Sequence, residues 1–165
     1  KNFYNTIYDT LKVSCMVFVI ITGAMVFGRF LAITRIPFDI ATWVISLPFS
    51  PVAILSVIFV IYVFGGMLMD SLALLLITIP IFYPVAMQLG YDPIWFGVMI
   101  TVITTMGAIT PPVGATAYVV SGIATDVPLE KVFQGILYFI PAYIIAIILM
   151  MVFPEIILYL PGLIK

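Results

Sequence analysis

Long stretches without a charged residue are the feature that most restricts how this chain can fold. No Asp, Glu, Lys or Arg occurs in residues 40–69, 71–91, 93–125 or 132–154. An apolar helix of about 20 residues crosses the hydrocarbon core of a bilayer, which is about 30 Å thick. With 65% hydrophobic and 8% charged residues, the chain carries about a third of the charge that is usual in soluble domains. We therefore expect an all-α integral membrane protein, with a single membrane domain over residues 1–165.

The composition also excludes several classes of protein. Disordered chains are poor in apolar residues and high in net charge, whereas this chain is apolar and has a net charge of -1. Its scattered Lys and Arg residues give no basic surface for nucleic acid. The lack of histidine excludes His-based metal sites and proton relays, and the single Cys15 excludes an intrachain disulfide. We expect no signal peptide, and because the chain begins with Lys1 we expect a piece of a longer protein.

The charges divide the chain into segments. Residues 11–34 are expected to form a spanning helix, with the side chain of Arg29 reaching from its end toward the interface. Residues 37–48 begin and end with a proline, and Arg35, Asp39 and Trp43 recur at every fourth position in and just before this segment. This pattern predicts a short amphipathic helix that lies in the interface. Residues 132–154 are expected to form a second spanning helix.

A first break interrupts the apolar runs at FGGMLMDS. Two glycines and the carboxylate of Asp70 separate two apolar pieces, of which the first is short for a crossing and suits a re-entrant half-helix. Asp70 is the only charged residue between Asp39 and Asp92, and an intramembrane carboxylate by default faces a cavity or a partner. Two alternatives stay open: the break brings Asp70 to the water interface, or Asp70 caps the helix that follows it.

The second break, GAITPPVGA, contains two consecutive prolines. Pro111 and Pro112 have no N–H groups, so we expect the carbonyls of Gly107 and Ala108 to be free of helical partners. Gly107 and Gly114, on either side, allow a close approach of the backbone or a positive φ. Free carbonyls at membrane depth are ligands for a desolvated Na⁺, and the N-termini of half-helices attract carboxylates.

Hydroxyl groups gather around the second break. Thr101, Thr104 and Thr105 are expected to share one helical face, while Thr110 and Thr116 flank the double proline. These hydroxyls are candidate ligands for an ion or an anion. The alternative is an ordinary spanning helix with a proline kink, whose hydroxyls donate back to carbonyls four residues earlier. A double proline between glycines is a stronger break than a kink needs, which favours a binding site.

One part of the chain resembles the C-terminal half of the large permease subunit of TRAP transporters, the tripartite ATP-independent periplasmic transporters. The resemblance covers residues 66–124 and rests on the order of the motifs. They are a break GMLMD, an apolar run with two prolines, a turn GYDPIWFG, and then GAITPPVG. The rest of the chain is compatible with the family in its hydropathy only.

The resemblance implies an elevator-type secondary transporter built from two inverted repeats. Each repeat contains a re-entrant hairpin and an unwound helix, and this chain would supply the second repeat. On that basis residues 51–88 form the hairpin and residues 93–125 the broken helix, although the sequence alone also allows the two roles to be exchanged. In the family, Na⁺ and an organic acid anion bind where the hairpin tip meets the unwound segment.

Matching the motifs residue by residue gives a set of candidate ligand-binding residues. The resemblance implies an ion- and substrate-binding site at Gly66, Asp70, Gly107, Thr110, Pro111, Pro112 and Gly114. Thr105 and Thr116 are added from their spacing. Within this set we expect the Na⁺ ligands at Gly107, Ala108 and Thr110.

The family also implies a function and partners. It implies Na⁺-coupled import of organic acid anions without covalent chemistry, so we expect no enzyme and no cofactor other than the coupling ion. The implied partners are a small permease subunit, a periplasmic substrate-binding protein, the N-terminal half of the same permease and the lipid bilayer. The implied location is the inner (plasma) membrane of a bacterial or archaeal cell.

Other functions stay open at this point. One is an ion-coupled anion carrier of related architecture that needs no binding protein. Another is a membrane-embedded subunit that only supports assembly and transports nothing. Coupling to protons instead of Na⁺ also stays open, because a buried Asp70 could titrate.

Overall fold

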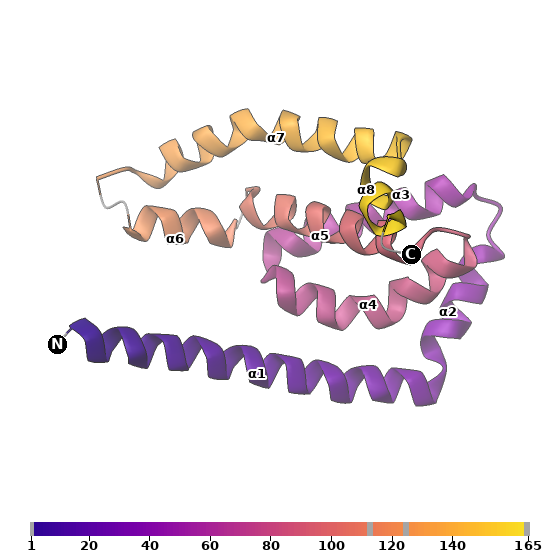
Figure 1. Ribbon diagram of the computed structural model, residues 1–165, viewed down its shortest axis with the longest axis horizontal. Coiled ribbons are helices and arrows are strands. Elements are labelled where there is room, and N and C mark those ends of the chain that lie inside the picture. The colour runs from indigo at the N-terminus through magenta and orange to yellow at the C-terminus, as the bar shows by residue number, and fades with distance from the viewer. Residues whose placement is uncertain (1, 112–113, 124–125, 164–165) are drawn as a thin grey trace.

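The structure is a computed structural model that describes residues 2–111, 114–123 and 126–163. In these residues all regular secondary structure is helical and no strand occurs, which confirms the expected all-α class. The helices are α1 (Asn2–Thr34), α2 (Ile36–Ile45), α3 (Pro51–Leu68), α4 (Ser71–Gln88), α5 (Pro93–Ile109), α6 (Ala115–Ile123), α7 (Leu129–Val152) and α8 (Glu155–Gly162). Figure 1 shows α1 and α7 along opposite sides, with α3, α4 and α5 between them.

The first two helices differ in extent from the expected segments. α1 begins at Asn2 rather than at residue 11, because no proline or glycine interrupts the preceding residues. At about 1.5 Å per residue a helix of this length exceeds the hydrocarbon core. It ends at Thr34, before Arg35, whose φ of 56° is left-handed. α2 then begins at Ile36, with Pro37 in its first turn. α2 is shorter than residues 37–48 and packs on α4 with Ala41 fully buried.

A short polar side chain caps the start of both α3 and α5. The Ser50 Oγ accepts a hydrogen bond from the N–H of Ala53 at 3.3 Å, and Pro51 follows at the first helical position. Asp92 and Pro93 repeat this arrangement at α5. A proline at that position removes no helical hydrogen bond, because the first N–H groups of a helix have no intrahelical partner. Local sequence therefore determines where these helices begin.

The chain folds back between α3 and α4, whereas α6 continues beyond the end of α5 (Figure 1). The reversal occurs at Met69 and Asp70, which have extended backbone conformations between the two helices. The fold-back therefore lies within residues 51–88 and the interrupted helix within residues 93–125. Their placement in the bilayer remains a prediction.

The core lies between α3 and α5. Each helix buries a stripe of residues at three- and four-residue spacing, which places these side chains on one face. The buried residues of the two stripes are Leu55, Ile58, Phe59 and Tyr62 on α3, and Phe96, Met99, Ile100 and Ile103 on α5. The next positions of these stripes are Gly66 on α3 and Gly107 on α5, both buried. The buried stripes of α3 and α5 therefore continue into the two breaks.

A tryptophan joins the other end of α5 to α7. The Trp95 Nε1–H donates to the carbonyl of Met150 at 2.9 Å. In a helix that carbonyl would accept from residue 154, but residue 154 is Pro154, which has no N–H. Trp95 therefore satisfies a carbonyl that the end of α7 leaves without a helical donor. Tyr91 stacks on the Trp95 ring at 5.3 Å, and burial raises the pKa of the Tyr91 phenol.

Replacing Trp95 with Phe is expected to weaken the contact between α5 and α7. The substitution keeps an aromatic ring but leaves the Met150 carbonyl without its donor, at a cost of about 1–3 kcal/mol. Thermal unfolding in detergent measures this loss. The matched control is Trp43→Phe, because Trp43 is 65% exposed on α2. Equal melting temperatures for the two variants would show that the Trp95 hydrogen bond contributes nothing to stability.

The outer helices bury little of their apolar surface. α7 has no fully buried residue among its described side chains, and α1 exposes large residues such as Phe18, Val19 and Met25. Such surface is unfavourable in water. α1, α3, α4 and α7 are long and apolar enough to cross a membrane. Lipid or further helices therefore surround this part of the protein.

Candidate functional site

The two breaks meet through their glycines. A Cβ atom on Gly66 would lie 2.6 Å from the carbonyl oxygen of Thr104 and 3.2 Å from the Cα of Gly107. A Cβ atom on Gly107 would lie 2.5 Å from the carbonyl oxygen of Val63. All three neighbours are backbone atoms, so α3 and α5 touch backbone to backbone at this point, which only glycine permits. The structure thus brings two of the candidate residues, from different breaks, into direct contact.

The Gly107 carbonyl is not free, and that expectation is wrong. It accepts a hydrogen bond from the N–H of Thr110 at 2.9 Å, because the last turn of α5 tightens and replaces the donor that Pro111 lacks. The Thr110 hydroxyl donates to the carbonyl of Met106 at 2.6 Å. A carbonyl oxygen that accepts one hydrogen bond keeps a second lone pair, and a hydroxyl that only donates keeps both of its lone pairs. Both oxygens therefore retain the capacity to coordinate a cation.

The threonines of α5 do not share one face, contrary to expectation. Thr104 is fully buried against α3, whereas Thr101 and Thr105 are exposed. Successive helical residues are rotated by about 100°, so Thr104 and Thr105 point to different sides. The hydroxyls of all three donate to carbonyls of the preceding turn, as in the proline-kink alternative. Thr105 therefore does not lie at the contact between Gly66 and Gly107, because its side chain points away from α3.

Asp70 caps α4. Its Oδ1 accepts hydrogen bonds from the N–H groups of Leu72 at 3.0 Å and Ala73 at 3.2 Å, and the side chain is exposed. The capping alternative for Asp70 is therefore present in the structure. The negative charge of a carboxylate at a helix N-terminus interacts favourably with the positive end of the helix dipole. The same residue thus fixes the start of α4 and places a negative charge at the hairpin tip, residues 65–70.

The remaining candidate residues lie after the end of α5. Gly114 is buried, and its φ of 51° is left-handed. A Cβ atom there would lie 3.2 Å from the carbonyl oxygen of Ile109 and 3.3 Å from that of Thr110. Pro111 is half-buried, and Thr116 is exposed on α6. Pro112 lies outside the described residues.

The contact region offers oxygen atoms and helix ends. Among the described residues, no group of three or more His, Cys, Asp or Glu residues could hold a metal ion. The polar atoms at the breaks are instead backbone carbonyls, the Thr110 hydroxyl and the Asp70 carboxylate. Oxygen ligands of this kind suit a hard cation such as Na⁺. The N–H groups of Leu72 and Ala73 at the start of α4 are already taken by the Asp70 carboxylate.

Residues 1–156 match the family described as tripartite ATP-independent periplasmic transporter, DctM component. The chain is 37% identical over 151 residues to the C4-dicarboxylate TRAP transporter large permease protein DctM of Pseudomonas aeruginosa. It is 33% identical over 163 residues to the sialic acid TRAP transporter large permease protein SiaM of Vibrio cholerae. These alignments cover 92% and 99% of the chain.

This chain belongs to the DctM family of TRAP transporter permeases. It spans 35% and 38% of the length of the two relatives. The family and the four apolar helices together indicate a multi-pass membrane protein.

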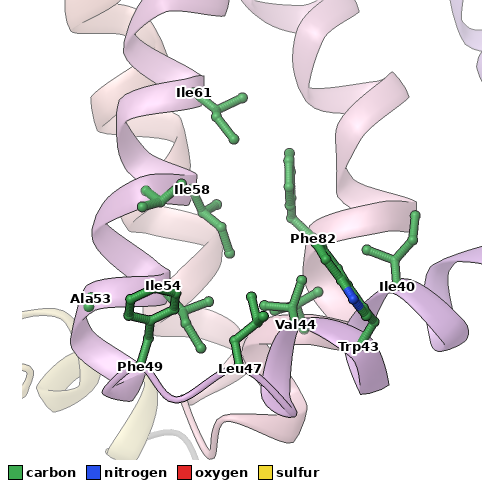
Figure 2. A pocket seen from close by; sticks show the side chains of 12 residues that line it. Ile40, Trp43, Val44, Leu47, Phe49, Ala53, Ile54, Ile58, Ile61 and Phe82 are labelled. Carbon is green, nitrogen blue, oxygen red and sulfur yellow. The ribbon is translucent and has the colours of Figure 1, made fainter.

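A cavity elsewhere in this DctM-family chain is unsuited to an ion. It has a volume of about 410 Å³ and lies between α2, α3 and α4, as Figure 2 shows. Trp43 and Ile40 line it from α2, Ile54 and Ile58 from α3, and Phe82 from α4. None of its lining residues belongs to either break. Apart from the indole N–H of Trp43, the lining side chains carry no polar atom, so the cavity offers a cation no oxygen ligand.

Two features of the region were not recognised among the candidate binding residues. The Thr104 carbonyl faces Gly66, and the Tyr62 hydroxyl lies 2.9 Å from the Thr78 hydroxyl across the hairpin. The spacing of Tyr62 one helical turn before Gly66 is visible in the sequence. Its partner on α4 is not, because the pairing depends on how the two helices are rotated against each other.

Proposed function

We propose that this chain is part of the membrane permease of a Na⁺-coupled secondary transporter. The transporter imports organic acid anions that a periplasmic binding protein delivers to the inner membrane of a bacterial cell. The small permease subunit and the rest of the large permease complete the machinery. The chain itself contributes the hairpin of α3 and α4 and the interrupted helix of α5 and α6.

One observation carries this proposal: the backbone contact between Gly66 and Gly107. Interrupted helices expose carbonyl oxygens and helix ends, and in membranes such backbone is tolerated only where it is buried in protein or lines a cavity. Two interruptions that touch each other create one polar region between apolar helices. Discontinuous helices that meet in this way are typical of ion and substrate sites in secondary transporters.

The proposed roles divide between the two breaks. Backbone carbonyls at Gly107 and Ala108, with the Thr110 hydroxyl, coordinate Na⁺. The Asp70 carboxylate, which already accepts the N–H groups at the start of α4, adds negative charge for Na⁺, whereas the N-terminus of α6 faces the carboxylate of the transported anion. Pro111, Pro112 and Gly114 keep the chain from continuing as one helix, and Thr116 contributes a hydroxyl from α6. Thr105 has no role at the contact in this proposal, because its side chain is exposed on the other side of α5.

The names of the relatives support an organic acid anion. One is named for C4-dicarboxylates and another for sialic acid, and both substrate classes carry carboxylates. We assign the carboxylate, the group that the two have in common, to this chain's site. The particular acid depends on the binding protein and on the other half of the permease.

Transport assays on the complete system test the proposal. The full permease and its small subunit are reconstituted in proteoliposomes with the binding protein and a radiolabelled carboxylate outside. An inward Na⁺ gradient is expected to drive uptake at least tenfold above a matched K⁺ gradient. Omitting the binding protein is expected to remove the uptake.

Each alternative function gives a different result. Uptake that persists without the binding protein indicates an anion carrier of related architecture. Uptake driven by a pH gradient and indifferent to Na⁺ indicates proton coupling. Normal uptake after replacing Asp70 with Asn and Pro111–Pro112 with Ala–Ala, while only assembly changes, indicates a structural subunit.

A further inference from the structure

A hydrogen bond joins the two arms of the hairpin below its tip. The Tyr62 hydroxyl on α3 and the Thr78 hydroxyl on α4 lie 2.9 Å apart. Tyr62 is fully buried, and its ring packs on Phe82 of α4 at 5.6 Å. The bond therefore sits inside the apolar contact between the arms, where an unpaired hydroxyl is unfavourable.

The direction of this hydrogen bond follows from the partners. The Thr78 hydroxyl donates to the carbonyl of Leu74 at 2.7 Å. Since a threonine hydroxyl has only one proton, the Tyr62 hydroxyl is the donor to Thr78. Protons thus point in sequence from Tyr62 to Thr78 and on to Leu74. Hydrogen bonds arranged in such a series strengthen one another.

Tyr62 and Leu74, the first and last residues of this hydrogen-bond series, both lie close to the hairpin tip. Tyr62 lies one helical turn before Gly66, on the stripe of α3 that faces α5. On the other arm, the Leu74 side chain packs on Gly65, where a Cβ atom would lie 2.9 Å from its methyl groups. The hydrogen bond between Tyr62 and Thr78 therefore joins the two segments that carry or contact Gly65 and Gly66.

We propose that Tyr62 and Thr78 are a positioning pair that holds the hairpin tip, residues 65–70, in its ion-binding conformation. The pair touches neither ion nor substrate and acts through Gly66, which contacts Gly107. This inference rests on the proposed Na⁺-coupled function. Its consequence is that the pair sets the apparent affinity for Na⁺ while leaving the turnover of the loaded transporter unchanged.

Removing the Tyr62 hydroxyl tests the pair. Tyr62→Phe keeps the ring against Phe82 and deletes only the donor. The Na⁺ concentration for half-maximal uptake is expected to rise about fivefold, the factor that corresponds to losing one typical hydrogen bond of the competent state. Maximal uptake at saturating Na⁺ is expected to stay within twofold of the wild type. The assay is uptake by the complete reconstituted transporter over a Na⁺ titration.

Variants at Thr78 separate the pair from a general loss of stability. Thr78→Val removes the acceptor and is expected to raise the half-maximal Na⁺ concentration by a similar factor. The double variant with Tyr62→Phe is expected to add little, because both changes delete the same bond. Thr78→Ser keeps the hydroxyl and is expected to restore the wild-type value. Matched controls are Tyr83→Phe and Thr22→Val, which alter exposed residues of α4 and α1.

Amide hydrogen exchange gives a readout that does not depend on Na⁺ coupling. Residues 65–70 are expected to exchange several-fold faster in Tyr62→Phe than in the wild type or in Tyr83→Phe. Unchanged exchange, additive effects in the double variant, or a fall in maximal uptake without a change in Na⁺ affinity would each overturn the inference. If uptake by the wild type ignores Na⁺, the proposed function fails, and the exchange measurement alone then decides whether the pair positions the tip.

Discussion

Replacing Gly107 with alanine is expected to lower uptake by the complete transporter at least tenfold. The new Cβ atom would lie 2.5 Å from the Val63 carbonyl oxygen and 3.1 Å from the Cα of Gly66. Because both are backbone atoms, no side chain can move aside, and α3 must separate from α5. Overpacking of this kind costs about 1–3 kcal/mol. A loss of about 1.4 kcal/mol in the free energy of binding already lowers the affinity tenfold. Uptake and thermal unfolding of the same preparation measure the effect.

Other glycines of the chain provide matched controls for this substitution. Gly97 is on the same helix, and a Cβ atom there would have no neighbour within 4 Å. Gly97→Ala is therefore expected to leave uptake intact and to raise stability by up to about 1 kcal/mol, the difference in helix propensity. Gly66→Ala is expected to resemble Gly107→Ala, because its Cβ atom also meets backbone. Normal uptake in Gly107→Ala would contradict the importance of the backbone contact.

Replacing Asp70 with Asn is expected to abolish Na⁺-coupled uptake without unfolding the hairpin. Asparagine caps helices about as well as aspartate, so the hydrogen bonds to Leu72 and Ala73 survive while the negative charge beside the tip is lost. The melting temperature and the assembly with the small subunit are expected to match the wild type. Uptake in a Na⁺ gradient is expected to fall at least tenfold. Radiolabel uptake and size-exclusion chromatography provide the two measurements.

Asp92 offers a control with the same local geometry. Its Oδ1 accepts hydrogen bonds from the N–H groups of Ile94 and Trp95 at 2.8 and 3.1 Å, so it caps α5 as Asp70 caps α4. It lies at the end of α5 that is remote from the break. Asp92→Asn is therefore expected to leave uptake unchanged. If both Asn variants transport normally and only Asp70→Ala is impaired, Asp70 serves as a helix cap and nothing more.

Much of the fold follows from local rules that can be read along the chain. Proline and short polar residues mark the starts of α3 and α5 at Ser50–Pro51 and Asp92–Pro93. The apolar runs between charges predict the helices themselves. The largest difference in extent is at α1, which begins at Asn2, because charges mark the expected edge of a membrane segment but do not end a helix.

That the two breaks meet was predictable from the motifs, but the atoms in contact were not. The glycines at 66 and 107 were expected to lie near each other only through the family resemblance, and the structure places them in contact. The carbonyl of Gly107 was expected to be free and instead accepts from Thr110. This hydrogen bond forms because the last turn of α5 tightens where Pro111 lacks an N–H group. The spacing of residues in the sequence does not determine such a local change of the backbone.

The sequence by itself determined that the helices lie in lipid, that the protein is all-α, where its two breaks occur and which residues cap the helix starts. Composition and short-range hydrogen bonding decide these features within a few residues of each position. Only the tertiary structure decided that Gly66 meets Gly107, that Thr104 faces inward while Thr105 faces outward, and that Tyr62 pairs with Thr78. The physical reason is that helices which are apolar on all sides carry little directional pattern. Their rotation and register are therefore set by close packing against one another.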